Sequence, residues 1–85
     1  MLVSFTPRAF EEYNDWQEQD KKIAGKLNKL IKDIMAHPHE GLGKPEPLKH
    51  DLQGYWSRRI NSEHRVVYFV ENNGNITITQ CRGHY

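Results

Sequence analysis

Residues 55–81 read YWSRRINSEHRVVYFVENNGNITITQC and contain three runs with the composition of β-strands. The runs cover residues 55–60, 64–70 and 75–81, and each is rich in β-branched and aromatic side chains. Two short segments of turn-forming residues separate them, NSE at 61–63 and NNG at 72–74. This stretch therefore predicts an antiparallel meander of three strands.

The middle run places its side chains alternately on two faces of the predicted sheet, because successive residues of a strand point in opposite directions. One face receives Arg65, Val67 and Phe69, and the other receives Val66, Tyr68 and Val70. Spacing alone leaves open which face is buried.

Residues 1–36 predict a short strand at 1–5 followed by two helices. Thr6 and Pro7 suit a helix start, and Phe10, Tyr13 and Trp16 then recur at helical spacing, which is typical of a core stripe. Asp20 suits the cap of a second amphipathic helix, which Pro38 ends. We expect an α+β fold in which an N-terminal strand and a helix hairpin pack on the antiparallel sheet, in the order β-α-α-β-β-β.

The length of 85 residues predicts one domain, 1–85, with a core near the lower size limit for folding without disulfides. A single cysteine, Cys81, excludes an internal disulfide, and no export signal is visible at the N-terminus. The longest apolar run, 66–70, is too short to cross a bilayer. We therefore expect a cytoplasmic protein with no membrane association.

Charge is nearly balanced, with 12 Lys and Arg against 11 Asp and Glu, but it is unevenly distributed. Residues 44–85 hold six basic and four acidic side chains plus three histidines, and four of the basic residues are arginines. The planar guanidinium group suits phosphate, so an RNA or DNA backbone is a reasonable partner. A solvated sheet face explains the same pattern, and composition leaves both interpretations open.

Residues 37–53 show no periodicity and contain three prolines and two glycines, which predicts a long functional loop. The His37-Pro38-His39-Glu40 segment lacks a second cluster of ligands, and no glycine-rich phosphate loop is present. Cys81 has no adjacent base in the sequence and is expected to be an inert buried thiol. We therefore expect no metal and no cofactor.

The remaining polar residues supply the groups needed for RNA cleavage without a metal. Such a reaction needs a base for the ribose 2′-hydroxyl, cations for the transition-state charge and an acid for the departing 5′-oxygen. Glu46 suits the base, Arg65 and Arg59 the cations, and His84 the acid. Tyr85 suits base stacking.

Several motifs along the whole chain resemble those of the YoeB/Txe family of bacterial toxins, within the RelE superfamily of toxin–antitoxin ribonucleases. The resemblance runs through DWQE at 15–18, LIKD at 30–33, GLGKPEPLKH at 41–50, GYWSRRI at 54–60, EHRVVY at 63–68 and CRGHY at 81–85. It implies a small RelE-like toxin that enters the decoding site of the 70S ribosome and cuts messenger RNA. It also implies a cognate antitoxin, similar to YefM or Axe, that holds the toxin inactive.

The resemblance also assigns roles to individual residues. It implies that Glu46 is the general base, His84 the general acid, Arg65 the transition-state cation and Tyr85 a terminal catalytic tyrosine. The positions expected to line the same site and contact RNA are Lys49, His50, Arg59 and Arg58.

Two other functions stay open at this point. Relatives of similar fold poison DNA gyrase, and an RNA-binding or ribosome-docking module without catalysis would share the basic face. Neither alternative explains why Glu46, Arg65 and the His84-Tyr85 pair occur together. Codon preference, the antitoxin's identity, activity on free RNA and homodimer formation are left open by the sequence.

Overall fold

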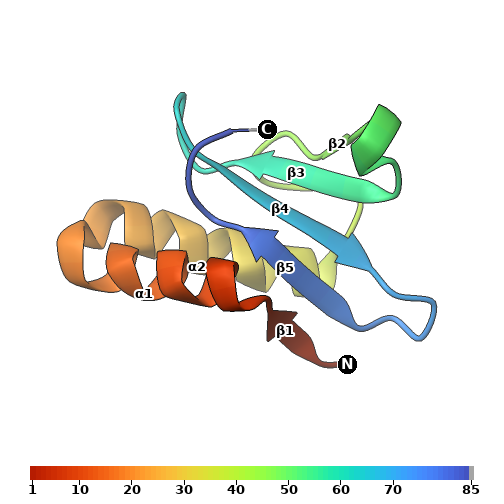
Figure 1. Ribbon diagram of the computed structural model, residues 1–85, viewed down its shortest axis with the longest axis horizontal. Coiled ribbons are helices and arrows are strands. Elements are labelled where there is room, and N and C mark those ends of the chain that lie inside the picture. Colours follow the sequence, from red (N-terminus) through yellow and green to blue (C-terminus); the bar gives the residue numbers. More distant parts are fainter. Residues whose placement is uncertain (85) are drawn as a thin grey trace.

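The computed structural model describes residues 1–84 and shows two helices on one face of a five-stranded sheet (Figure 1). The elements in chain order are β1 (Val3–Phe5), α1 (Pro7–Gln19), α2 (Lys21–Ala36), β2 (Glu46–Pro47), the 3₁₀ helix η1 (His50–Leu52), β3 (Tyr55–Arg59), β4 (Arg65–Val70) and β5 (Ile76–Gln80). The predicted α+β architecture is confirmed. No helix within residues 1–84 is long and apolar enough to span a bilayer.

The helix hairpin begins and turns at the two predicted capping residues. The Thr6 hydroxyl accepts a hydrogen bond from the Ala9 N–H at 3.2 Å, and Pro7 occupies the first turn of α1. The Asp20 carboxylate accepts from the N–H groups of Lys22 and Ile23, both at 3.1 Å. Each cap satisfies backbone donors that would otherwise lack a partner, which stabilises a helix by about 1 kcal/mol. A single residue therefore suffices to join α1 to α2.

The sheet has the strand order β1-β5-β4-β3-β2. The pairs β3–β4 and β4–β5 are antiparallel, which confirms the meander. Strand β1 pairs with β5 in parallel, so the complete sheet is mixed rather than purely antiparallel. The parallel pair arises because the helix hairpin separates β1 from the meander and returns the chain across one face of the sheet.

The face of the sheet toward the helices carries the core. Val66 and Tyr68 of β4 are fully buried there, together with Ile76 and Ile78 of β5. Of the predicted core stripe, Trp16 of α1 is buried in the same cluster and Tyr13 packs against it, whereas Phe10 is 53% exposed, so the prediction is wrong for Phe10. The structure thus shows which face is buried against the helices: residues 66, 68 and 70 point to the helices, and residues 65, 67 and 69 lie on the opposite face. That face, called the open face because no helix covers it, still holds Val67 at 3% exposure.

The segment 37–53 is more ordered than the predicted long loop. Glu46 and Pro47 form the short edge strand β2 against β3, and His50–Leu52 form η1. An edge position accepts Pro47, because proline has no N–H to donate to a ladder. The correction matters for the site, since strand pairing gives Glu46 a fixed register.

Candidate active site

Glu46 reaches the open face of the sheet through the pairing of β2 with β3. The register places Glu46 opposite Ser57, and the Leu48 N–H continues the pairing by donating to the Tyr55 carbonyl at 2.8 Å. Residues opposite each other in a sheet point to the same face, so Glu46 shares the open face with Tyr55 and Ser57. Leu48 is buried while Glu46 is exposed. The buried leucine therefore secures the strand that presents the carboxylate.

Arg59 and Arg65 stand directly opposite each other at the end of the β3–β4 ladder. The Arg65 Nη1 donates to the carbonyls of Asn61 at 2.8 Å and His64 at 3.1 Å, which holds the guanidinium against the turn. Like charges directly opposite in a sheet are destabilising. The register thus gives this end of the ladder two adjacent positive charges.

The C-terminal segment passes beside the start of β4. Both backbone groups of Gly83 are bound there: its N–H donates to His64 Nδ1 at 2.9 Å, and its carbonyl accepts from the Arg65 N–H at 2.8 Å. Gly83 has φ +75 with open space at its Cβ position, so the backbone conformation rather than close approach requires glycine. The segment therefore delivers the exposed His84 next to Arg65. Tyr85, the other predicted catalytic residue here, lies outside the described residues.

Four predicted residues thus lie on adjacent segments of the open face. Glu46 is on β2, Arg59 on β3, Arg65 on β4, and His84 on the segment paired with Arg65 through Gly83. Neighbouring strands are about 4.8 Å apart, so the backbones of the Glu46 and His84 segments are separated by roughly 14 Å. The strands that carry Arg59 and Arg65 lie between these two segments.

Lys49 and His50 follow Glu46 past the start of β3, at the opposite end of that strand from the Arg59–Arg65 pair. With Glu46, Pro47, Leu48 and Leu52 they line an open pocket of about 300 Å³. The backbone of Lys44 has φ +54 and that of His50 φ +58, the two non-glycine residues with positive φ in the described chain. Such conformations cost about 1–3 kcal/mol each and concentrate at functional sites. This strain flanks Glu46 on both sides.

Arg58 does not belong to the site, and its predicted contact with RNA is wrong. Its side chain is fully buried and forms an ion pair with Asp33 of α2, with Nη1 and Oδ2 2.5 Å apart. It also donates to the Tyr68 hydroxyl and to the carbonyls of His37, Glu40 and Leu42. The guanidinium therefore holds α2, the following loop and β4 together. The signal was present in the sequence, because strand alternation puts Arg58 on the same face as Trp56.

Asp33, Gly41 and Gly43 are residues whose importance the sequence did not reveal. A Cβ added at Gly41 would lie 2.2 Å from Asp33 Oδ2, and one at Gly43 would lie 2.8 Å from the Leu30 side chain. Both glycines also have positive φ, +114 and +78. The glycines let the loop close over the Asp33–Arg58 pair, so the GLG motif serves packing.

The hydrogen bonds from the Leu42 N–H and from Arg58 hold the pKa of Asp33 below its ordinary value of 3.8. A carboxyl whose pKa is lower in the folded state stabilises the fold above its unfolded pKa and loses that contribution as the pH falls. We expect Asp33→Asn to be less stable than the unsubstituted chain at pH 7, with a difference that shrinks below about pH 4. Urea unfolding of both proteins from pH 7 to pH 3 measures this; a constant difference would contradict it.

Cys81 is buried, and burial raises the pKa of its thiol to about 12. The prediction that the thiol is buried is confirmed, and the raised pKa disfavours the nucleophilic thiolate form. Among residues 1–84, no three His, Cys, Asp or Glu side chains gather as a metal-binding group.

Comparisons with known proteins agree with this arrangement. A family model described as "YoeB-like toxin of bacterial type II toxin-antitoxin system" matches residues 5–85. The chain is 51% identical to Toxin YoeB of Escherichia coli K12 over the full length of both proteins. It superposes on a YoeB/ParE toxin from Agrobacterium tumefaciens with a TM-score of 0.96, at 45% identity and with both chains fully covered.

Staphylococcus aureus YoeB is a third similar protein, and it has been solved both as a dimer and in complex with YefM. The dimer structure has a TM-score of 0.90 and the complex 0.89, each at 49% identity and covering 100% of this chain and 98% or 99% of the other. The full-length identity and the matching family model together establish the assignment. The chain belongs to the YoeB family of toxins of bacterial type II toxin–antitoxin systems.

Proposed function

We propose that this toxin is a ribosome-dependent endoribonuclease that cuts messenger RNA in the ribosomal A site of the cytoplasm. The observation that carries the proposal is the gathering of Glu46, the Arg59–Arg65 pair and His84 on adjacent segments of the open face. These residue types are the base, the cations and the acid that RNA transesterification requires. Lys49 and His50 extend the basic surface that would contact the bound RNA.

The proposed reaction is an internal transesterification. The Glu46 carboxylate removes the proton of the ribose 2′-hydroxyl, and the 2′-oxygen attacks the adjacent phosphorus. The P–O5′ bond breaks, and the leaving 5′-oxygen takes a proton from the His84 imidazolium. The products are a 2′,3′-cyclic phosphate and a 5′-hydroxyl, so no water or oxidant is consumed.

The arginines stabilise the charge that develops during this step. Arg65 is suited to the role because two backbone carbonyls already hold its guanidinium, so it does not need to reorganise when charge accumulates on the phosphoryl oxygens. Arg59 is exposed and opposite it, at the position to contact a second phosphoryl oxygen or the neighbouring phosphate. A guanidinium can supply the charge stabilisation that a divalent ion supplies in other nucleases. The mechanism proposed for this chain is therefore metal-independent.

The chemical identity of the cut ends tests this function. We expect the upstream fragment of ribosome-bound mRNA to end in a 2′,3′-cyclic phosphate and the downstream fragment to begin with a 5′-hydroxyl, at codon-phased positions. Sequencing with end-specific adapters distinguishes these ends. A 3′-hydroxyl with a 5′-phosphate, the product of water attacking through metal ions, would rule out the mechanism. Gyrase-linked DNA breaks with intact transcripts would instead favour a gyrase poison.

We also propose that a YefM-like antitoxin controls this site. The support is the likeness to S. aureus YoeB, solved with YefM, together with the arginines and Lys49 that surround the open face. An acidic antitoxin segment that orders on contact would satisfy these cations and exclude RNA from the face. A homodimer, the form in which S. aureus YoeB was also solved, is proposed as a second assembly.

A further inference from the structure

The turn between β3 and β4 contacts two of the proposed catalytic groups, and His64 lies at its centre. The Asn61 side chain orders the turn by accepting from the N–H groups of Glu63 at 2.8 Å and His64 at 2.7 Å. The carbonyls of Asn61 and His64 hold the Arg65 guanidinium, while the His64 ring accepts the Gly83 N–H. One short segment thus contacts Arg65 directly and His84 through the preceding peptide.

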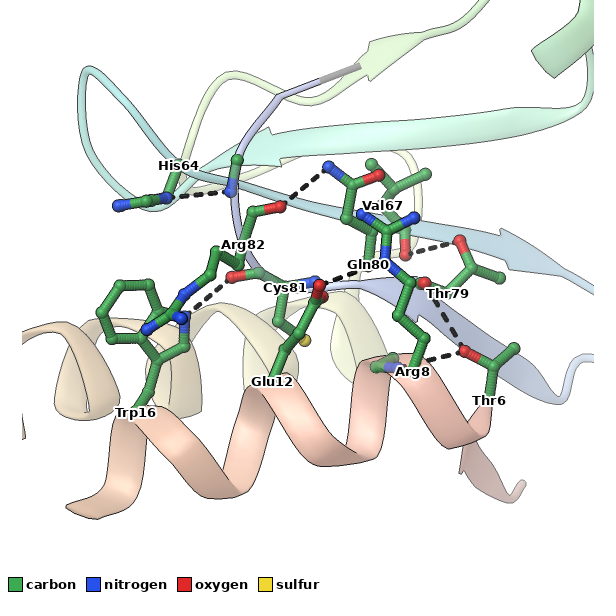
Figure 2. A network of polar contacts seen from close by, with 12 residues as sticks. Thr6, Arg8, Glu12, Trp16, His64, Val67, Thr79, Gln80, Cys81 and Arg82 are labelled. Carbon is green, nitrogen blue, oxygen red and sulfur yellow. Dashed lines mark hydrogen bonds and ion pairs between the residues drawn. The ribbon is translucent and has the colours of Figure 1, made fainter. Parts of the chain in front are cut away.

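The His64 ring lies between Trp16 and the C-terminal segment (Figure 2). Only 14% of its side chain is exposed, and it meets the Trp16 ring edge-on with 4.8 Å between centroids. Its Nδ1 faces a backbone N–H, which can only donate, so Nδ1 carries no proton and acts as the acceptor. Its Nε2 lies 3.7 Å from the Glu63 carboxylate. The ring therefore presents a fixed acceptor to Gly83.

Helix α1 holds the rest of the C-terminal segment on the other side (Figure 2). The Glu12 carboxylate accepts from the Cys81 N–H at 2.8 Å, and the Trp16 Nε1 donates to the Cys81 carbonyl at 2.9 Å. The Arg82 guanidinium lies over the Trp16 ring, 4.2 Å from its centroid, and donates to Gln19. These contacts fix the segment up to residue 82. The direction in which it continues depends on Gly83.

Gly83 turns the chain at this point with a φ of +75, a backbone conformation that favours glycine. With the Arg65 N–H holding its carbonyl, the His64 bond to its N–H is the second restraint on the same residue. Two restraints on one residue define the orientation of the peptide that leads into His84. Loss of either would let the imidazole rotate away from the leaving oxygen.

We propose that His64 is a positioning residue that orients the general acid His84 through the Gly83 N–H. The inference rests on the proposed ribonuclease function and deepens it. His64 touches neither the RNA nor the reacting atoms in this role. A misplacement of about 1 Å at a reacting group can cost on the order of 10²-fold in rate, so the expected effect is of that size or smaller.

The test uses an RNA substrate whose leaving group does not need a proton, so that its cleavage does not require the general acid. An mRNA with a 5′-bridging sulfur at the scissile position releases a thiolate, which departs without protonation. Single-turnover cleavage on ribosomes is measured for both substrates with the unsubstituted chain, His84→Ala and His64→Phe, which keeps a ring against Trp16 but removes the acceptor. We expect His64→Phe to slow ordinary cleavage by up to about 10²-fold and to cut the sulfur substrate at close to the unsubstituted rate.

The matched control is His39→Phe. His39 also packs on a tryptophan, Trp56, with 4.8 Å between ring centroids, but it has no contact with the C-terminal segment among the described bonds. It should behave like the unsubstituted chain on both substrates. His64→Asn, which restores an acceptor without a ring, should recover part of the lost rate. In a His84→Ala background, His64→Phe should cause no further loss on ordinary RNA.

A second variant removes the donor and leaves the His64 ring intact. Joining residues 1–80 to a synthetic 81–85 peptide at Cys81 allows the Gly83 N–H to be replaced by an ester oxygen in the full chain. This ester variant should slow ordinary cleavage and leave cleavage of the sulfur substrate nearly unchanged, as expected for His64→Phe. If His64→Phe does not fold, the ester variant alone tests the positioning role.

The outcomes separate the two proposals. Equal slowing of both substrates, unchanged ordinary cleavage, or an additive loss with His84→Ala would overturn the positioning role. Ordinary cleavage that is absent in the unsubstituted chain, or unchanged in His84→Ala, would instead overturn the proposed function.

Discussion

Glu46→Gln is expected to reduce cleavage of ribosome-bound mRNA by about 10²- to 10⁴-fold, the usual contribution of a general base. The amide keeps the shape of the side chain but cannot take the 2′-hydroxyl proton at neutral pH. Glu46 is exposed on the edge strand β2 and contributes no core area, so the melting temperature and ribosome binding should be unchanged. Single-turnover cleavage and a ribosome-sedimentation assay measure the two properties separately.

The matched control for this substitution is Glu18→Gln, which removes an exposed carboxylate on α1, outside the gathered site residues, and should cut normally. Arg65→Ala is expected to lose about 10²- to 10³-fold, the typical cost of removing a donor that stabilises transition-state charge. Full toxicity of Glu46→Gln in cells at equal expression would show that another group is the base.

Arg58→Leu is expected to lower the free energy of unfolding by about 3–5 kcal/mol, the range seen when one partner of a buried ion pair is removed. The leucine leaves the Asp33 carboxylate without its cation and the carbonyls of His37, Glu40 and Leu42 without their shared donor. Small domains have about 5–15 kcal/mol of total stability, so this loss is a large fraction of it. Urea unfolding followed by circular dichroism measures the change.

Its neighbour Arg59 provides the control, since the two arginines are adjacent in the chain and point to opposite faces of β3. Arg59 is exposed on the open face, so Arg59→Leu should leave stability nearly unchanged and impair cleavage. Arg58→Leu should lower the free energy of unfolding but leave cleavage nearly unchanged at temperatures where the variant remains folded. If both variants unfold at the same urea concentration as the unsubstituted chain, the structural role of Arg58 is wrong.

Arg58 shows where pattern reasoning failed. Strand alternation places it on the face of Trp56, which packs against the core. A buried guanidinium is so costly without partners that an arginine in a strand is normally interpreted as exposed. The partners that remove this cost, Asp33 and three loop carbonyls, are 16 to 25 residues away in the chain. No local pattern reveals them.

The loop that carries Glu46 shows a second limit. Its prolines and glycines predicted irregular structure, and the pairing of two residues with β3 is too short to produce a periodic signal. The turn at Gly83 is similar: the glycine was visible, but the histidine that binds it is 19 positions away. The contact between His64 and Gly83 was therefore not predicted.

The sequence by itself determined the local elements and their order, because capping residues, apolar periodicity and turn residues act within a few positions of one another. Examples of elements determined in this way are the beginnings of the two helices at Thr6 and Asp20 and the β3–β4–β5 meander. The tertiary structure alone decided which face of β4 is buried, which arginine pairs with Asp33, and that the segments carrying Glu46, Arg65 and His84 lie on one face of the sheet. The physical reason is that these outcomes depend on strand register and on contacts between distant residues, whose energies no single segment contains.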